Sequence, residues 1–409
     1  MKNICKLGLA LTATALLSIA GSKSAVAATM HSITEYLITD LGDLDSTYPD
    51  SYSYSRGINN NGEVVGFSYT REGNRAFLWD SQNAMNNLSI LGGGKSNFSN
   101  DTPTYAYGVN DKSQVVGWAK TSGGVSAFLW DKTRGIENLG ALDSRVTDNY
   151  YNLATGINNK TEVVGYSYTN NGYRAFLWDR EKGIQNLGAL DTPSNGYGNS
   201  YATGINNQSQ VVGYSFTNQG WRPFLWENGA IKNLGILSND DNHSYNNSYA
   251  TGINDKGQIV GYVSSPDGGS QAIRWENGLV QRLGSFYNTA AIAVNNKGQT
   301  VGYSYQNGQQ PFLYRATLWE NDMAFDLNTL ISPNSGWSLH SAIGINDLGE
   351  IIGNGEFQGR RKTFALKPKT ILKAQVPEFT PTFSLLVFSS FSLSLSFFRK
   401  NKPSCLSAK

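Results

Sequence analysis

Short apolar segments alternate with polar turns along most of the chain, and the same four kinds of segment recur in a fixed order. One set consists of residues 184–190, 201–206, 211–216 and 223–226. Three of the four segments are rich in Val, Ile, Phe, Tyr or Trp, and polar residues bound them all, which is typical of β-strands. No segment sustains the 3.6-residue period of an amphipathic helix. The pattern predicts an all-β protein.

The segments form a repeat unit close to 48 residues long, and residues 156–190 (GINNKTEVVGYSYTNNGYRAFLWDREKGIQNLGAL) hold most of one copy. The Gly-Ile-Asn motif of the unit, or a variant of it, begins at positions 57, 108, 156, 204, 252, 293 and 344. Four strands in a unit of this length are typical of a propeller blade. We therefore expect a seven-bladed β-propeller of four-stranded blades, similar to kelch and WD40 proteins. An open β-solenoid is the alternative.

The two ends of the repeat region predict how the ring closes. A lone segment of the first kind, residues 38–42, precedes the first unit, and the chain's last segment of the fourth kind is residues 364–366. The seventh blade therefore lacks one strand, and the N-terminal segment is spare. Pairing of the two would complete the blade and remove an open sheet edge. A solenoid would not need complementary ends.

Two residue types recur in the unit for structural reasons. A tryptophan ends the fourth segment in six units, and we expect it to pack between blades: Trp79, Trp130, Trp178, Trp226, Trp275 and Trp319. A glycine follows the first two residues of the third segment in all seven units, where two backbones should approach closely: Gly66, Gly117, Gly165, Gly213, Gly261, Gly302 and Gly353.

The turn between the second and third segments is rich in Asn, Asp and Gly, which suit the positive φ of a tight hairpin. Calcium loops of integrin-type propellers invite comparison, but calcium needs several carboxylates or carbonyls at alternate positions. The turn at Asn158-Asn159-Lys160 offers amides and a lysine. We predict a plain hairpin there and no metal site.

The N-terminus has the features of an export signal. Two lysines accompany an apolar run over residues 7–20, and Ala25 and Ala27 form a small-x-small cleavage pattern. We expect a signal peptide over residues 1–27, with cleavage after Ala27. An N-terminal membrane anchor is the alternative.

The C-terminus combines a short motif, an apolar run and a basic cluster. A linker over residues 369–382 holds the motif, and residues 383–402 form the predicted transmembrane helix with its basic stop; the key positions are Val376, Pro377, Glu378, Arg399 and Lys400. The arrangement resembles the PEP-CTERM sorting signal of Gram-negative bacteria that make extracellular polysaccharide. The resemblance implies processing by an exosortase-type enzyme and at least transient anchoring in the inner membrane. Phe379 stands where the signal usually has proline, so a permanent tail anchor is the alternative. Positive charge after the helix predicts a cytoplasmic C-terminus and an exported body.

Taken together, the units resemble the HAF-repeat family of bacterial extracellular proteins. The family pattern is GIN-x-x-G-Q-V-V-G, then A-F-L-W, then L-G-x-L, and it recurs almost continuously from Ile38 to Leu366. We assign the repeat propeller to residues 36–368. Members often carry a PEP-CTERM tail, so the two resemblances agree. The family has no established catalytic residues to transfer.

The composition gives no support for a nucleic-acid-binding or metal-dependent function. A formal net charge of +2 with 16% charged residues gives no electrostatic basis for binding nucleic acid. Three scattered histidines, His31, His243 and His340, have no metal-ligand spacing.

Cys5 would leave with the signal peptide, so the exported body can form no internal disulfide. Residues 92–96 lack the first glycine of a phosphate loop. We predict no cofactor, no metal and no catalytic residue, although a propeller can assemble an active site from distant blades.

The variable loops give the candidate ligand site. In an up-and-down blade, alternate connections emerge on the same face. The connection before the second segment therefore shares a face with the hairpin between the third and fourth segments. Aromatic residues in these places would offer sugars a stacking surface beside amides and carboxylates: Tyr150, Tyr151, Tyr197, Tyr245 and Trp337, with Tyr173 and Trp221 at equivalent hairpin tips. The alternative is that such loops are polar and aromatic only to stay soluble and hold their turns.

The sequence predicts an exported binding module at the cell surface or in the extracellular matrix, with extracellular polysaccharide as its partner. A glycan-acting enzyme, either a lyase or a hydrolase, is one alternative. A purely structural surface protein is the other.

Overall fold

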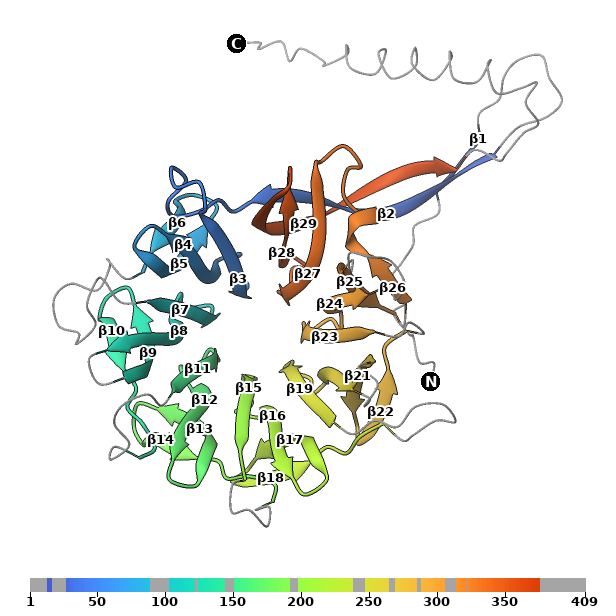
Figure 1. The fold of residues 1–409 in the computed structure, drawn as a ribbon. Helices are drawn as coiled ribbons and strands as arrows, with labels where there is room; N and C mark the ends of the chain where they lie inside the picture. Colours follow the sequence, from blue (N-terminus) through green and yellow to red (C-terminus); the bar gives the residue numbers. More distant parts are fainter. Residues whose placement is uncertain are drawn as a thin grey trace, which may run out of the picture. The chain divides into compact units, whose positions relative to one another are not determined.

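The computed structural model describes residues 13–16, 27–88, 103–121, 124–143, 151–191, 198–237, 247–264, 269–284, 288–305, 314–321 and 323–375. They fall into two units. Tyr36–Pro368 forms one, and the residues before and after it belong to the other. The unit Tyr36–Pro368 is a ring of seven antiparallel sheets, the blades of a β-propeller (Figure 1). The predicted fold class is confirmed.

Blades 1 to 6 each consist of four consecutive strands, numbered from the innermost strand outward. Blade 1 comprises β3 (Tyr52–Ile58), β4 (Val64–Thr70), β5 (Gly73–Asp80) and β6 (Ala84–Asn87). Blade 2 comprises β7 (Thr104–Val109), β8 (Val115–Thr121), β9 (Gly124–Asp131) and β10 (Gly135–Asn138). Blade 3 comprises β11 (Asn152–Ile157), β12 (Val163–Thr169), β13 (Gly172–Asp179) and β14 (Gly183–Asn186).

The next three blades repeat this plan with small changes in strand length. Blade 4 comprises β15 (Ser200–Ile205), β16 (Val211–Thr217), β17 (Gly220–Glu227) and β18 (Ala230–Asn233). Blade 5 comprises β19 (Asn247–Ile253), β20 (Ile259–Ser264), β21 (Ser270–Glu276) and β22 (Leu279–Arg282). Blade 6 comprises β23 (Thr289–Val294), β24 (Thr300–Tyr305), β25 (Tyr314–Glu320) and β26 (Met323–Asp326), and the 3₁₀ turn η1 (Leu327–Thr329) follows it.

Blade 7 takes its strands from both ends of the chain. Its strands are β27 (Trp337–Ile345), β28 (Ile351–Phe357), β29 (Arg360–Gln375) and β2 (Ala27–Asp40). The short strand β1 (Ala13–Leu16) pairs with the beginning of β2. Because β2 lies next to β29, the first strand of the ring in sequence completes its last blade.

Closure of the ring confirms that the two ends pair, and the open solenoid is therefore wrong. Just beyond β2, the Leu41 backbone N–H donates to the Thr363 carbonyl oxygen at 3.2 Å. The Thr363 hydroxyl lies 2.8 Å from the hydroxyl of Ser53, which belongs to blade 1. β2 begins well before the predicted segment at 38–42, because β29 continues beyond the predicted segment at 364–366 and offers it a longer partner.

A β-bulge interrupts the pairing of the first two strands at the same place in every blade. In blade 3 it lies between Ala154 and Gly156, so Thr155 has no cross-strand partner. Opposite Ala154, Gly165 leaves no room for a side chain, because a Cβ there would lie 1.9 Å from the Leu153 carbonyl oxygen. The equivalent distance is 1.9 to 2.1 Å in the other blades. This close approach explains the glycine of the third segment.

The hydrophobic core is divided into clusters between neighbouring blades. Between blades 2 and 3, Leu129, Val163 and Trp178 are buried together. Each repeated tryptophan belongs to such a cluster or packs against one: Trp130, Trp178, Trp275 and Trp319 are buried, and Trp79 and Trp226 are partly buried. Because each cluster draws on two blades, a blade depends on both neighbours for its burial.

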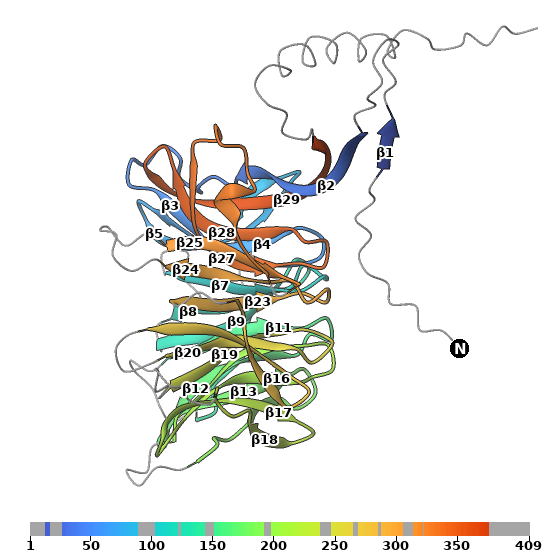
Figure 2. The same ribbon diagram turned by 90° about the vertical axis from the view of Figure 1, so that its right-hand side faces the viewer.

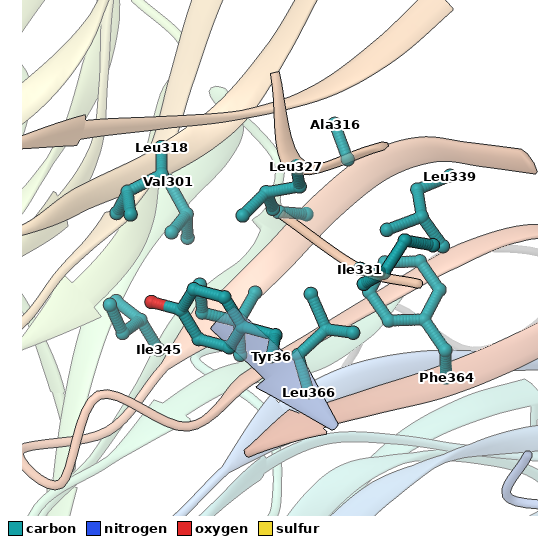
Figure 3. Packing of buried hydrophobic residues seen from close by; sticks show 12 residues of the cluster. Tyr36, Val301, Ala316, Leu318, Leu327, Ile331, Leu339, Ile345, Phe364 and Leu366 are labelled. Carbon is teal, nitrogen blue, oxygen red and sulfur yellow. The ribbon is translucent and has the colours of Figure 1, made fainter. Parts of the chain in front are cut away.

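The cluster at blade 7 includes a residue of the N-terminal strand. Tyr36 of β2 packs among Leu318, Ile345 and Leu366, which come from β25, β27 and β29 (Figure 3). Its side chain is 5% exposed. This burial raises the pKa of the Tyr36 phenol to about 12. The closing strand is therefore held by core packing as well as by backbone pairing.

Viewed from the side, the strands run across the thickness of the ring, so the turns collect on two faces (Figure 2). One face carries the turns between the first and second strands, such as residues 158–162 of blade 3. We name it the turn face. The opposite face carries the turns between the second and third strands, such as residues 170–171, and is named the hairpin face.

Candidate functional site

The turn face is organised by a closed circle of asparagine side chains, one from each blade. In every case the side-chain Nδ2 donates to the backbone oxygen of the equivalent asparagine in the next blade, at 2.8 to 3.1 Å. The members are Asn59, Asn110, Asn158, Asn206, Asn254, Asn295 and Asn346. Asn346 donates to Asn59, which completes the circle. All seven side chains are buried, so this inner circle is a structural device.

A second circle lies one residue further along the chain. Each backbone N–H donates to the side-chain Oδ1 of the equivalent residue in the next blade, at 2.8 to 2.9 Å. The members are Asn60, Asp111, Asn159, Asn207, Asp255, Asn296 and Asp347. The carboxylates also accept from neighbouring amides; Asp111 Oδ2 accepts from the Nδ2 atoms of Asn60 and Asn159 at 3.2 and 2.8 Å. Amide donors thus satisfy the three carboxylates of this outer circle.

Both circles line a cavity of about 210 Å³ on the turn face. The Ile or Val residue that precedes each asparagine of the inner circle also lines it. Most of its polar side chains already bond to one another, so little hydrogen-bonding capacity is left for a ligand. Within the described part of the chain, no three His, Cys, Asp or Glu side chains gather in a way that could hold a metal ion. The predicted hairpin at Asn158-Asn159-Lys160 thus joins its blade to the next one.

The fourth residue of this turn has positive φ in every blade, and in three blades it is not glycine. Ser113, Thr161 and Ser209 have φ of 60°, 69° and 65°. Such a conformation is unfavourable, most of all for a β-branched residue. Each hydroxyl donates to a Glu or Gln side chain of the preceding blade; that of Thr161 reaches Gln114 Oε1 at 2.8 Å. A hydrogen bond between blades therefore offsets the backbone strain.

The hairpin half of the ring carries aromatic side chains that pack against one another, and rings meet across the boundaries between blades 1 and 2, 3 and 4, and 4 and 5. We name them the aromatic belt: Tyr52, Tyr54, Phe67, Tyr69, Tyr105 and Trp118 in blades 1 and 2; Tyr166, Tyr168, Tyr173, Tyr201, Tyr214, Phe216, Trp221, Tyr249 and Tyr262 in blades 3 to 5; and Tyr303, Tyr305 and Tyr314 in blade 6. In blades 3 to 5 the centroids of Tyr166 and Tyr201 lie 4.8 Å apart, and those of Tyr214 and Tyr249 lie 5.1 Å apart. Most of these rings are partly exposed, and Tyr314 is 50% exposed.

The two predicted hairpin residues, Tyr173 and Trp221, belong to this belt. The Tyr201 ring lies between them, at centroid distances of 5.5 Å from Tyr173 and 5.8 Å from Trp221. Their backbones are fixed by the next blade, because the N–H of Tyr173 and that of Trp221 donate to Asn199 and Asn247 side chains, both at 2.9 Å. The two residues therefore present their rings from a rigid backbone.

Two arginine side chains bond to the backbone of the same hairpin residues. The guanidinium groups of Arg174 and Arg222 donate from Nη1 to the carbonyl oxygens of Tyr173 and Trp221, each at 3.0 Å. Burial lowers the pKa of both guanidinium groups. The starting pKa of arginine is so high that both stay charged at neutral pH.

Burial keeps the phenols of three belt tyrosines, Tyr166, Tyr201 and Tyr262, protonated over the physiological range. Burial, reinforced by Tyr214 and Tyr173, raises the pKa of Tyr201 to about 12. Burial also raises the pKa values of Tyr166 and Tyr262. A phenol that keeps its proton can both donate and accept a hydrogen bond. Tyr166, Tyr201 and Tyr262 thus combine stacking surfaces with uncharged hydroxyl groups.

The other predicted ligand residues differ in their location and exposure. Tyr151 is 48% exposed at the start of blade 3. Trp337 is half-buried, with its ring 5.2 Å from Phe357, and packs against the blade 7 core. Tyr150, Tyr197 and Tyr245 lie outside the described residues.

Sequence reasoning missed the central ring of the belt, Tyr201, together with Tyr249. Both occupy the same place in the second segment, within the motif Ser-Tyr-Ala-Thr-Gly-Ile. The sequence predicts ligand contacts only in the loops and at the hairpin tips, and these two residues lie in neither. The sequence signal is the tyrosine that recurs three residues before the Gly-Ile-Asn motif in units 1, 2, 4 and 5, and its partial exposure is seen only in the structure.

Of the processing residues, Ala27 is the first residue of β2, and Ala25 lies outside the described residues. The sorting-signal positions Val376, Pro377, Glu378, Arg399 and Lys400 and the predicted helix over 383–402 also lie outside them. No helix in the described ranges is long and apolar enough to cross a membrane.

No protein-family model matches the chain, and no curated protein does. Among solved structures, it is similar to the β-propeller domain of the Trilobed protease from Pyrococcus furiosus, with 10% identity over 81% of this chain and 98% of that one and a TM-score of 0.47. An acylaminoacyl peptidase from Pyrococcus horikoshii shows 11% identity over 85% of this chain and 55% of its own, with a TM-score of 0.46. The fucose-recognising lectin of Aleuria aurantia, a six-bladed propeller, shows 12% identity over 82% and 97%, with a TM-score of 0.33. At these identities the similarity concerns the fold alone.

Proposed function

We propose that the protein is an exported carbohydrate-binding propeller whose aromatic belt holds extracellular polysaccharide at the cell surface or in the matrix. The single observation that carries this proposal is the run of touching, partly exposed rings across blades 3 to 5. Tyr173, Tyr201 and Trp221 stand at its centre.

The chemistry of the belt suits sugars. The apolar faces of a pyranose ring stack on aromatic planes, and its hydroxyl groups need neutral donors and acceptors. The belt offers both, in its aromatic planes and in the protonated phenols of Tyr166, Tyr201 and Tyr262. The turn face is less suited, since its asparagine and aspartate side chains are used in the two circles.

Support for export comes from the sequence. The N-terminal signal features, the HAF-type repeats and the PEP-CTERM-like tail each favour a body outside the cytoplasm. The tail resembles a sorting signal of bacteria that make extracellular polysaccharide, and this resemblance suggests the ligand class of the proposal.

A binding assay with full-length protein tests the proposal. We expect the protein to bind one or more members of a panel of neutral and acidic polysaccharides, including material from the matrix of the producing cells. Tyr173→Ala and Trp221→Ala should each weaken binding about tenfold, because each removes a stacking surface. Trp221→Phe should retain part of the affinity.

The control is Leu348→Ala, which removes an exposed apolar side chain from the turn face (58% exposed). It should bind as the parent does. If no polysaccharide binds, or if both belt variants bind unchanged while thermal unfolding shows them folded, the belt has no role in sugar binding. A purely structural role would then be favoured.

A further inference from the structure

At one position of the repeat, blade 1 has a residue whose chemistry differs from that of its equivalents in the other blades. It is the bulged residue of the innermost strand, which has no cross-strand partner. The seven residues are Arg56, Tyr107, Thr155, Thr203, Thr251, Ile292 and Ile343. Six are partly buried, and Arg56 is exposed. In three other blades a threonine occupies this position and bonds to the next blade. The Thr155 hydroxyl, for example, donates to the Ala202 carbonyl oxygen of the next blade at 2.9 Å.

Arg56 is held by aromatic rings. Its guanidinium carbon lies 5.8 Å from the ring centroid of Phe67 in its own blade and 5.5 Å from that of Tyr107 in blade 2. β3 and β7, which carry Arg56 and Tyr107, are neighbouring innermost strands (Figure 1). Stacking of this kind orients the planar guanidinium and leaves its N–H groups at the edge.

The charge of Arg56 is not matched by an acid. No ion pair or side-chain hydrogen bond of Arg56 is found among the described residues. Other basic residues of blades 1 and 7 differ in this respect: Arg71 pairs with Asp45 at 2.9 Å, and Lys362 pairs with Asp43. An oriented guanidinium without a carboxylate partner is suited to bind an anionic group from outside the protein.

A stacking surface lies directly beside this cation. The Phe67 ring contacts Tyr105 at 4.7 Å, and Tyr105 stacks on Trp118 at 4.1 Å and 20°. A ligand whose acidic group reaches Arg56 can therefore place a sugar ring on the aromatic belt of blades 1 and 2.

We propose that the polysaccharide bound by the belt is acidic, and that Arg56 binds its anionic substituent, a carboxylate or a sulfate ester. The inference rests on the proposed function, because it names the chemical class of ligand for the same belt. Arg56 is then the residue that sets specificity, and the rings of Phe67 and Tyr107 position it.

The test compares polymers that differ only in charge. Polygalacturonate is measured against the same polymer after reduction of its carboxyl groups, and dextran sulfate against dextran, by calorimetry with full-length protein. We expect tighter binding of the acidic member of at least one pair, with an affinity that falls as salt is added. The pair that shows the difference tells carboxylate from sulfate.

Two substitutions locate the effect. Arg56→Gln should weaken binding of the acidic polymer at least about tenfold and leave any binding of the neutral polymer unchanged. Arg56→Lys keeps the charge without the planar fork and should give an intermediate loss. Lys112→Gln, which removes one exposed positive charge from the turn face, is the matched control and should have no effect.

Three outcomes overturn the inference. The first is equal binding of acidic and neutral polymers. The second is loss of binding in Trp221→Ala but none in Arg56→Gln, which would leave the proposed function standing. The third is a lower thermal midpoint in Arg56→Gln with an unchanged preference for acidic polymers, which would mean that Arg56 only ties blade 1 to blade 2. Absence of binding to every polymer refutes the proposed function itself.

Discussion

Replacement of Asn158 by alanine tests whether the inner circle of the turn face stabilises the ring. The Asn158 side chain is 4% exposed and makes four hydrogen bonds. Its Oδ1 accepts the backbone N–H groups of Lys160 and Glu162, both at 3.0 Å. Its Nδ2 donates to Glu162 Oε2 at 2.5 Å and to the Asn206 carbonyl oxygen at 3.0 Å. Alanine removes all four.

The expected loss follows from these contacts. A hydrogen bond contributes roughly 1 kcal/mol to stability, and a buried group left without a partner costs more than that. Four bonds give a loss of about 4 kcal/mol, of which about 1 kcal/mol belongs to the bond to the next blade. Asn158→Asp keeps the acceptor but turns a carboxylate oxygen toward Glu162 and the Asn206 carbonyl, so it should be at least as damaging.

Urea unfolding followed by tryptophan fluorescence measures the change, because four of the repeated tryptophans are buried between blades. Asn171→Ala is the matched control. It removes an exposed asparagine from the hairpin face of the same blade and should alter stability by less than about 0.5 kcal/mol. A loss below about 1 kcal/mol in Asn158→Ala, with an unchanged denaturant slope, would refute the idea that the circle holds the blades together.

Four other predictions can be tested in the same way. Gly165→Ala should cost roughly 3 kcal/mol or more or prevent folding, since its Cβ would lie 1.9 Å from the Leu153 oxygen; a variant of normal stability would contradict this. Thr161→Gly should change stability by less than about 1 kcal/mol, because relief of the positive φ offsets loss of the bond to Gln114; a large loss would show that the bond outweighs the strain. The pKa of Tyr201 is raised to about 12, so its protonated phenol contributes to the free energy of unfolding in full below the unfolded-state pKa near 10, and this contribution is lost as the pH rises toward 12. Absorbance at alkaline pH should show phenols that titrate late and together with unfolding. Titration of all phenols near pH 10 would contradict this prediction. Intact-mass analysis of protein from cells and medium should show loss of the chain after about Glu378, and full retention to Lys409 would indicate a tail anchor.

The fold could be predicted because its main determinants repeat. Seven spaced motifs gave the number of blades, and the unmatched segments at 38–42 and 364–366 predicted their pairing. The circles of the turn face could not be found this way. The turn at Asn158 was fully explained by local hairpin geometry, and the partner of its Nδ2 lies 48 residues away. No local pattern indicates such a contact.

The candidate site was predicted only in part, for a related reason. Tyr173 and Trp221 stood out because they vary between units at a hairpin tip. Tyr201 lies inside a repeated motif, so the sequence did not distinguish its partly exposed ring from residues that only build the blade. Arg56 was missed for the opposite reason. It occurs once, directly before the Gly-Ile-Asn motif, where three other units have threonine, and only the structure shows that this position is bulged.

The shared construction of blade 7 has a consequence for biosynthesis. During translation, β2 is the first strand of the ring to be made, and β29 is the last. The contact between Ser53 and Thr363 spans 310 residues, so the ring cannot close until almost the whole repeat region has been synthesised. Until then both the N-terminal strand and the growing end carry unpaired edges. Completion of the ring therefore requires synthesis to continue through β29, and a chain that stops before Arg360 remains open.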